Sequence, residues 1–340
     1  MQALFIIDTT NGEVYYKVLG LVSIIIVTVI VFYSGFKKGY PEITWLLIIL
    51  SGGFLFMIGE KLATYSPDEW MAFLTGFKLP ITSKRTVLGG IIGLMIGLIL
   101  AKKWLRFQAP VLDHYAIALP LLIAISRIGC LMAGCCFGTP TDLPWGIQYN
   151  FTTPAFQAHL LNRQVQFDDN ITAAVHPVQI YEMIGCLIIA FLAWKIRRKL
   201  IVSGSLFLFS LLCYAALRFL IEFIRAPESD LILVRPVLGL KTIQWVLMGI
   251  IIIGMMILVL REWKSEPLNE VLPPGRISVF RQAMLIVLIA FLVILVRKWF
   301  TSGEFTVILS IVSLVIIIIL GKISLWLIRS GFRHKMKFQE

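Results

Sequence analysis

The sequence is poor in charged residues. They make up 15% of its 340 residues, whereas a soluble domain carries about 25%. The rest of the composition is correspondingly apolar, with 59% hydrophobic residues and a mean hydropathy of +0.89. A soluble protein needs more polar cover than this. The composition therefore excludes a secreted disulfide scaffold, a disordered chain and a nucleic-acid-binding domain.

Basic residues are also missing from the N-terminus. No Lys or Arg precedes Lys17, so the positive region that opens a secretory signal peptide is absent, and we expect no cleavage. The net charge of +12 comes from short basic clusters between apolar runs. This pattern is typical of loops that orient membrane helices, so the charge does not indicate a nucleic-acid partner.

Long apolar runs recur along the chain and predict an all-α, polytopic integral membrane helical bundle. A charged, Pro-rich linker at 261–282 predicts a transmembrane core over 1–262 and an appended membrane hairpin with a basic tail over 263–340. We expect nine transmembrane helices, at about 18–36, 43–59, 86–101, 115–134, 177–194, 205–225, 242–260, 283–296 and 305–328.

The basic clusters predict the orientation of the bundle. They follow the first, third, fifth and ninth spans, whereas the loop 137–175 contains only Arg163. Because loops rich in Lys and Arg stay in the cytoplasm, we predict that the N-terminus lies outside and the C-terminus inside. The loop 60–85 departs from the rule, since its Lys61, Lys78, Lys84 and Arg85 would lie outside.

Ionisable residues inside membrane spans are costly and are usually functional. Three groups of them occur here: Arg127 in the fourth span, the segment His176–Glu182 that opens the fifth, and a series in the sixth. The series has spacings of four, four and three, which place its members on one helix face. It consists of Tyr214, Arg218, Glu222 and Arg225.

The predicted topology brings these groups together. The fourth and sixth spans run outward and the fifth runs inward, so all three groups fall in the outer half of the bilayer. There they would form a polar pocket at headgroup depth, and arginine suits bidentate phosphate recognition. A structural ion-pair network is the alternative, especially for Arg218 and Glu222 at i,i+4. Arg127 has no acidic neighbour on its own helix, so it needs a partner from elsewhere or an anionic ligand.

Glycines and cysteines surround these charges. Gly89, Gly90, Gly93 and Gly97 line the third span, and such small residues usually permit close helix packing. Cys130, Cys135 and Cys136 cluster near the outer end of the fourth span. Their C-x4-C-C spacing is not a recognised zinc spacing, so plain packing is favoured over a metal site or a thiol–disulfide role. We predict neither a metal nor a cofactor.

Two segments carry a resemblance to a known family. Asp113, Pro120, Arg127-Ile128-Gly129, Gly134 and Gly138 in and after the fourth span form the first. His176-Pro177-Val178-Gln179-Ile180-Tyr181-Glu182 forms the second and more specific one. Over roughly residues 15–260 the chain resembles prolipoprotein diacylglyceryl transferase, a bacterial plasma (inner) membrane enzyme family.

The resemblance implies a seven-helix core and a reaction. The family transfers the diacylglyceryl group of phosphatidylglycerol to the lipobox cysteine thiol of a prolipoprotein signal peptide. Arg127 and Arg218 would engage the lipid phosphate, and Glu182, His176 or Tyr214 would accept or steer the proton of the thiol. The implied substrate-binding residues are Gly89, Gly90, Gly129, Cys130, Gly134, Gly138, Gln179, Tyr181, Glu222 and Arg225.

The sequence also departs from the family pattern. The signature asparagine is Cys130 here, and the proposed catalytic histidine of the family maps to Leu88. Either another group activates the acceptor thiol, or the chain is a related phospholipid-dependent transferase with a different acceptor. A thiol redox protein, suggested by the three clustered cysteines, and a non-catalytic lipid-binding membrane protein are further alternatives.

Overall fold

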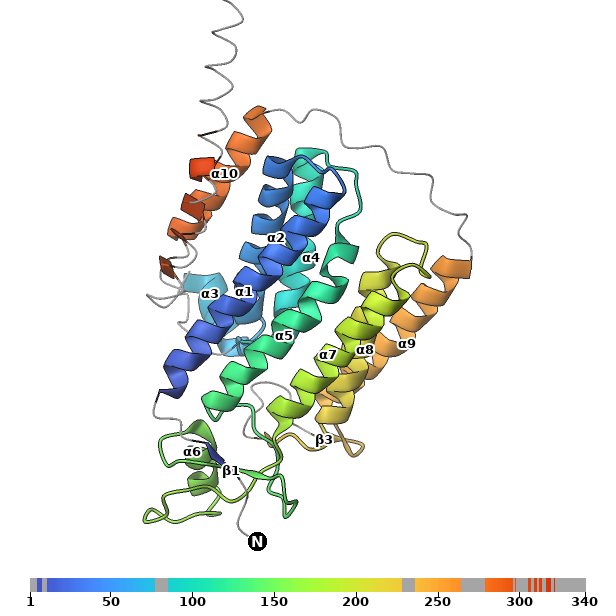
Figure 1. Ribbon diagram of the computed structural model, residues 1–340. Coiled ribbons are helices and arrows are strands. Elements are labelled where there is room, and N and C mark those ends of the chain that lie inside the picture. Colours follow the sequence, from blue (N-terminus) through green and yellow to red (C-terminus); the bar gives the residue numbers. More distant parts are fainter. Residues whose placement is uncertain are drawn as a thin grey trace, which may run out of the picture. The chain divides into compact units, whose positions relative to one another are not determined.

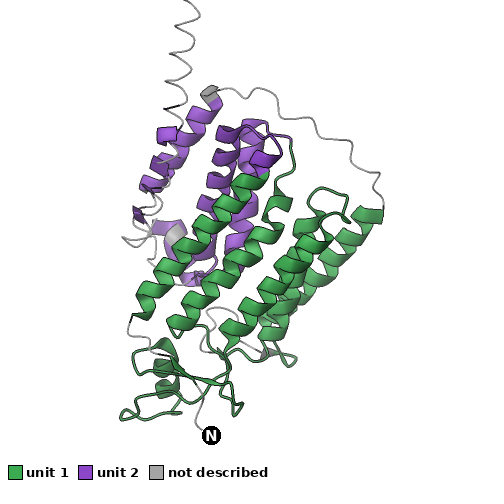
Figure 2. Cartoon of the chain, viewed as in Figure 1, with its two compact units in different colours: residues 1–34, 109–272 green, residues 35–108, 273–340 purple. Residues whose placement is uncertain are grey.

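The computed structural model describes residues 5–7, 11–76, 85–227, 236–263, 279–295, 297 and short pieces between 305 and 321. This described part is almost entirely helical (Figure 1). It divides into two compact units, residues 1–34 with 109–272 and residues 35–108 with 273–340 (Figure 2).

Six of the described helices are long and apolar enough to cross a membrane. They are α1 (Gly12–Lys37), α2 (Glu42–Leu62), α4 (Val87–Leu105), the 3-10 turn η1 (Leu112–His114) continued by α5 (Tyr115–Met132), α7 (Val178–Ile196) and α9 (Thr242–Trp263). Two shorter apolar helices are α8 (Ser205–Ile221) and α10 (Val279–Leu295). The predicted polytopic helical architecture is confirmed.

Other parts of the architecture stay predictions. The ninth expected span, 305–328, lies largely outside the described residues, as do the linker 264–278 and the basic tail. The count of nine spans, the boundary between 262 and 263, and the N-out, C-in orientation are therefore untested.

The first unit is built around α5, α7 and α8, which contact one another in all three pairs, with α9 against α8. Close approach depends on small residues. A Cβ at Gly185 of α7 would lie 2.5 Å from a methyl of Leu217 of α8. At one end of the α5–α8 pair, Asp113 accepts backbone N–H bonds from Gly204 at 2.7 Å and Phe207 at 3.1 Å. This carboxylate therefore caps the start of α8.

At the other end of these helices, the segment between α5 and α7 folds into short pairings. β1 (Phe5–Ile7) pairs in parallel with β2 (Ile147–Tyr149), and α6 (Pro154–Leu161) follows. The N–H of Thr139 donates to the carbonyl of Ile224 at 2.8 Å, which ties this segment to the end of α8. A small core supports it, made by Phe137, Ile147, Tyr149, Ala155, Val175 and Ala226.

Two further strands complete the first unit. β3 (Pro236–Val237) pairs in antiparallel fashion with β4 (Leu240–Lys241), directly before α9. This turn carries Lys241 to the N-terminus of α9.

The second unit centres on the pair α2 and α4, with α3 (Pro67–Gly76) and α10 in the same unit. Glycine lets the two backbones touch: a Cβ at Gly93 would lie 2.0 Å from the carbonyl oxygen of Leu55, and one at Gly97 would lie 2.5 Å from that of Ser51. The predicted packing role of the third-span glycines is confirmed for these positions.

Candidate functional site

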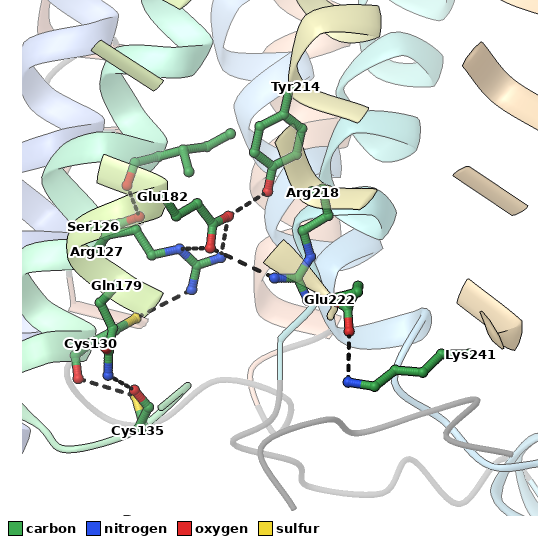
Figure 3. Close-up of polar contacts among 11 residues, drawn as sticks. Ser126, Arg127, Cys130, Cys135, Gln179, Glu182, Tyr214, Arg218, Glu222 and Lys241 are labelled. Atoms are coloured by element: carbon green, nitrogen blue, oxygen red, sulfur yellow. Dashed lines mark hydrogen bonds and ion pairs between the residues drawn. The ribbon is translucent and has the colours of Figure 1, made fainter. Parts of the chain in front are cut away.

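Three helices bring polar residues to one place in the first unit. Arg127 comes from the last turns of α5, Glu182 from the first turns of α7, and Tyr214 and Arg218 from the last turns of α8 (Figure 3). Because α7 runs opposite to the other two, the end of α5, the start of α7 and the end of α8 coincide. The three polar groups that the sequence singled out therefore meet.

Glu182 is the centre of the site. Its side chain is fully buried, and its Oε1 accepts hydrogen bonds from Nη2 of Arg127 and from the hydroxyl of Tyr214, each at 2.9 Å. Its Oε2 lies 2.9 Å from Nε of Arg127 and 3.7 Å from Nη1 of Arg218. The two contacts with Arg127 form a bidentate fork that fixes the guanidinium. The expectation that Arg127 needs a partner from another helix is confirmed.

A second buried carboxylate, Glu222, joins the site to the turn before α9. It forms an ion pair with Arg218 one helical turn earlier, and its Oε2 lies 3.2 Å from Nζ of Lys241. Lys241 also donates to the carbonyl of Arg225 at 3.0 Å. The i,i+4 pair is thus present as expected, but it belongs to a larger network.

The network is rich in positive charge. Four cationic side chains, Arg127, Arg218, Arg225 and Lys241, lie near the two carboxylates. Arg127 is 9% exposed and Arg225 is 6% exposed, so water screens them poorly. Arginine side chains gathered in this way are suited to receive an anion such as a phosphate.

The sulfur atoms of Cys130, Cys135 and Cys136 cluster beside the arginines. They lie within 4.8 Å of one another and form no disulfide. Sγ of Cys130 accepts a hydrogen bond from Nη1 of Arg127 at 3.7 Å. Hydrogen bonds with the other two thiols, together with the charges of Arg225 and Arg127, hold the pKa of the Cys136 thiol well below its usual range. Hydrogen bonds with Cys130 and Cys136 raise the pKa of the Cys135 thiol.

Comparison with known proteins places this site in a family. The family model described as prolipoprotein diacylglyceryl transferase matches residues 85–260. The chain belongs to the prolipoprotein diacylglyceryl transferase family. The matched range contains every member of the charged network, and the recognition made from the sequence is confirmed.

Several relatives carry the name phosphatidylglycerol–prolipoprotein diacylglyceryl transferase. The protein of Cupriavidus metallidurans is 34% identical over 173 residues, which are 50% of this chain and 57% of the relative. That of Bifidobacterium longum subsp. infantis is 30% identical over 184 residues, 52% of this chain and 56% of the relative. That of Clostridium tetani is 29% identical over 182 residues, 53% and 65% respectively. The chain thus spans little more than half the length of the first two relatives.

The family segment His176–Glu182 also supplies residues beside the network. Gln179 donates from Nε2 to the carbonyl of Cys135 at 2.6 Å, so it holds the turn after α5. The ring of His176 lies edge-on to Tyr181, with centroids 6.3 Å apart, and the hydroxyl of Tyr181 accepts from Nε1 of Trp145 at 2.7 Å. Burial lowers the pKa of His176. Its imidazole is therefore neutral at pH 7.

The family glycines have packing neighbours in the structure. A Cβ at Gly129 would lie 3.1 Å from Cα of Tyr16 in α1, and one at Gly138 would lie 2.6 Å from Cβ of His176. Gly134 has a φ of +62°, which turns the chain sharply after α5. Gly89 and Gly90 belong to the second unit, where their neighbours are Gly59, Ala63 and Phe56. Their predicted substrate-binding roles are untested.

Lys241 is the member of the network that the sequence analysis missed. It lies in β4, directly before α9, and has no helical spacing to the other charges. One signal was available, since it is a single basic residue at the predicted outer end of the seventh span, where basic residues are disfavoured.

Proposed function

We propose that the chain transfers the diacylglyceryl group of phosphatidylglycerol to the lipobox cysteine of a prolipoprotein signal peptide. The observation that carries the proposal is the convergence of four cations on two carboxylates within the family-matched range. An outer-leaflet anionic phospholipid of the bacterial plasma membrane would bring its phosphate to these cations. Family membership supports the same substrate.

Arg127 and Arg218 are the proposed phosphate-binding groups. Both contact Glu182, so a phosphate bound between them would share or replace that carboxylate as the partner of the guanidiniums. In the reaction the thiolate sulfur bonds to the glyceryl carbon that carries the phosphate. The carbon–oxygen bond breaks, and the electron pair leaves with the glycerol phosphate. The two arginines then stabilise the charge on this departing group.

The thiol must lose its proton before it attacks. Glu182 and Tyr214 are hydrogen-bonded to each other, so a proton taken by one is shared with the other. His176 offers a neutral imidazole with a buried Nδ1 that has no hydrogen-bond partner among the described residues. These three groups are the proposed proton acceptors in place of the family histidine found as Leu88 here.

The test uses purified full-length protein with labelled phosphatidylglycerol and a lipobox peptide. We expect a thioether-linked product, lost in Arg127→Ala and Arg218→Ala. Arg197→Ala is the matched control, because Arg197 is an exposed arginine at the far end of α7 and stacks on Trp194. Full activity in the two site variants would refute the proposal.

The nature of the acceptor is tested in a separate experiment. Leu88 and Cys130 stand where the family has histidine and asparagine, which favours a related transferase with a different acceptor as the second candidate. Transfer of label to a non-peptide thiol or alcohol, with none to the lipobox peptide, would support this candidate. Bound lipid without any product would indicate a binding protein.

A further inference from the structure

The three clustered cysteines have a geometry that the transferase reaction does not use. Cys130 lies in the last turn of α5, and Cys135 and Cys136 lie in the turn that follows it. All three sulfurs are mutually within 4.8 Å, although four residues of chain separate the first from the second. Two cysteines would suffice for a disulfide. Three sulfurs in mutual reach are what a shared thiophilic cation requires.

We propose that Cys130, Cys135 and Cys136 form a tris-thiolate site for Cu⁺. Soft thiolates select Cu⁺, zinc and iron–sulfur clusters, and the number of donors distinguishes among these. A structural zinc site is closed by four protein ligands, whereas Cu⁺ is satisfied by three thiolates. Among the described residues, the cluster holds three ligand atoms, all of them cysteine sulfurs. No other Cys, His, Asp or Glu of the described residues belongs to it.

The electrostatic surroundings favour the metallated form. One Cu⁺ held by three thiolates leaves two negative charges on the site. Arg127 contacts Sγ of Cys130 at 3.7 Å, and the charge of Arg225 acts on Cys136. Both are buried cations of the neighbouring network, so they offset part of the negative charge that metal binding creates.

The backbone holds the ligands in place. The N–H of Cys135 donates to the carbonyl of Cys130 at 3.2 Å, and the side chain of Gln179 fixes the carbonyl of Cys135 at 2.6 Å. Cys136 has a φ of +59°, a conformation that favours glycine or asparagine. Its sulfur is therefore held next to the other two by a locally strained turn, whereas a flexible loop would let it move away.

The experiment supplies Cu⁺ as its bathocuproine disulfonate complex to purified, reduced, full-length protein under anaerobic conditions. We expect the protein to remove one equivalent of Cu⁺ from the chelator, which lowers the visible absorbance of the complex. Each of Cys130→Ser, Cys135→Ser and Cys136→Ser should weaken binding by about tenfold or more. Cys186→Ser and Cys213→Ser are the matched controls, since these cysteines lie within α7 and α8, and they should leave binding unchanged.

A second measurement needs no variant and so does not depend on their folding. In wild-type membranes, Cu⁺ should protect Cys130, Cys135 and Cys136 from alkylation and leave the reactivity of Cys186 and Cys213 as before, as read by mass spectrometry. Three outcomes would overturn the proposal. They are no Cu⁺ uptake by folded protein, uptake that survives loss of any cluster cysteine, and preferential binding of Zn²⁺ by the same three residues. The result is independent of whether the protein has transferase activity.

Discussion

The two ends of the α5–α8 pair both hold acidic side chains near helix termini, but these side chains have different partners. At one end a single carboxylate, Asp113, accepts two backbone N–H groups from the start of α8. At the other end, Glu182 and Glu222 face four cationic side chains. Both ends hold acidic groups at helix termini. Only the second gathers several cationic side chains around its acidic groups.

The comparison separates a structural polar group from a functional one. Asp113 is satisfied by partial charges that the fold itself supplies, since the first N–H groups of a helix have no partner within it. The network around Glu182 gathers four cationic side chains in a place that water reaches poorly. It is this gathering of cations at one helix end that points to an anionic ligand.

The largest effect on stability should come from substitution of Glu182, the residue at the centre of the charged network. Glu182→Ala leaves Arg127 without its bidentate partner and Tyr214 without its acceptor, and we expect a loss of about 3–5 kcal/mol in the free energy of unfolding. Thermal melting in detergent measures this. Added inorganic phosphate should restore part of the loss, because an anion between the arginines replaces the carboxylate. A phosphate effect no larger than that on wild type would contradict the anion site.

Substitution of Lys241 should weaken ligand binding more than it lowers the stability of the fold. Its Nζ bonds to Glu222 and to the carbonyl of Arg225, yet Arg218 still pairs with Glu222 when the lysine is lost. We expect Lys241→Gln to weaken phosphatidylglycerol binding by about tenfold, equivalent to about 1.4 kcal/mol. The effect should shrink as salt is raised. Binding to lipid nanodiscs of stated phosphatidylglycerol content measures it, and an unchanged affinity would remove Lys241 from the site.

Lys241 also marks the limit of what the sequence can predict. Hydropathy located the apolar helices α1, α2, α4, α5, α7, α8, α9 and α10, because burial in lipid demands long apolar runs, but it did not locate the short helices α3 and α6. Spacing on α8 predicted the Arg218–Glu222 pair, and alternating span direction predicted that Arg127, Glu182 and Arg218 meet. These inferences are local or follow from chain direction. Lys241 lies at the end of the β3–β4 pairing, and no periodic pattern links it to the other charges.

The sequence predicted that the three cysteines cluster near the outer end of the fourth span, but it predicted neither the backbone conformation at Cys136 nor the β1–β2 pairing. Cys136 reaches the other two sulfurs through a positive φ, which its residue type does not suggest. The strand Phe5–Ile7 pairs with a partner that lies far along the chain, at Ile147–Tyr149. Such short strands carry no alternation long enough to recognise.

Substitution at the Asp113 end should lower the free energy of unfolding by less than substitution of Glu182. Asp113→Ala removes one acceptor from two backbone N–H groups at the start of α8, and the loss of a helix cap is worth about 1 kcal/mol. Melting should show this modest loss, while phosphatidylglycerol binding stays as in wild type. A change in lipid affinity as large as that of Lys241→Gln would erase the distinction between the two ends.

The smallest effect concerns pH, and it tests whether His176 serves the charged end as a proton acceptor. Burial favours the neutral imidazole and lowers its pKa from 6.5. The imidazole is therefore half protonated only at some pH below 6.5, and the transfer rate should fall as the pH falls through that lowered pKa. Between pH 8 and pH 6.5 we expect less than about a twofold change, whereas an unshifted histidine of pKa 6.5 would already be half protonated at the lower limit. The transfer rate, measured across this range in wild type and in His176→Gln, decides the point. A half-maximal rate at or above pH 6.5 in wild type, or an unaltered acid limb in the variant, would assign the proton to Glu182 and Tyr214 instead.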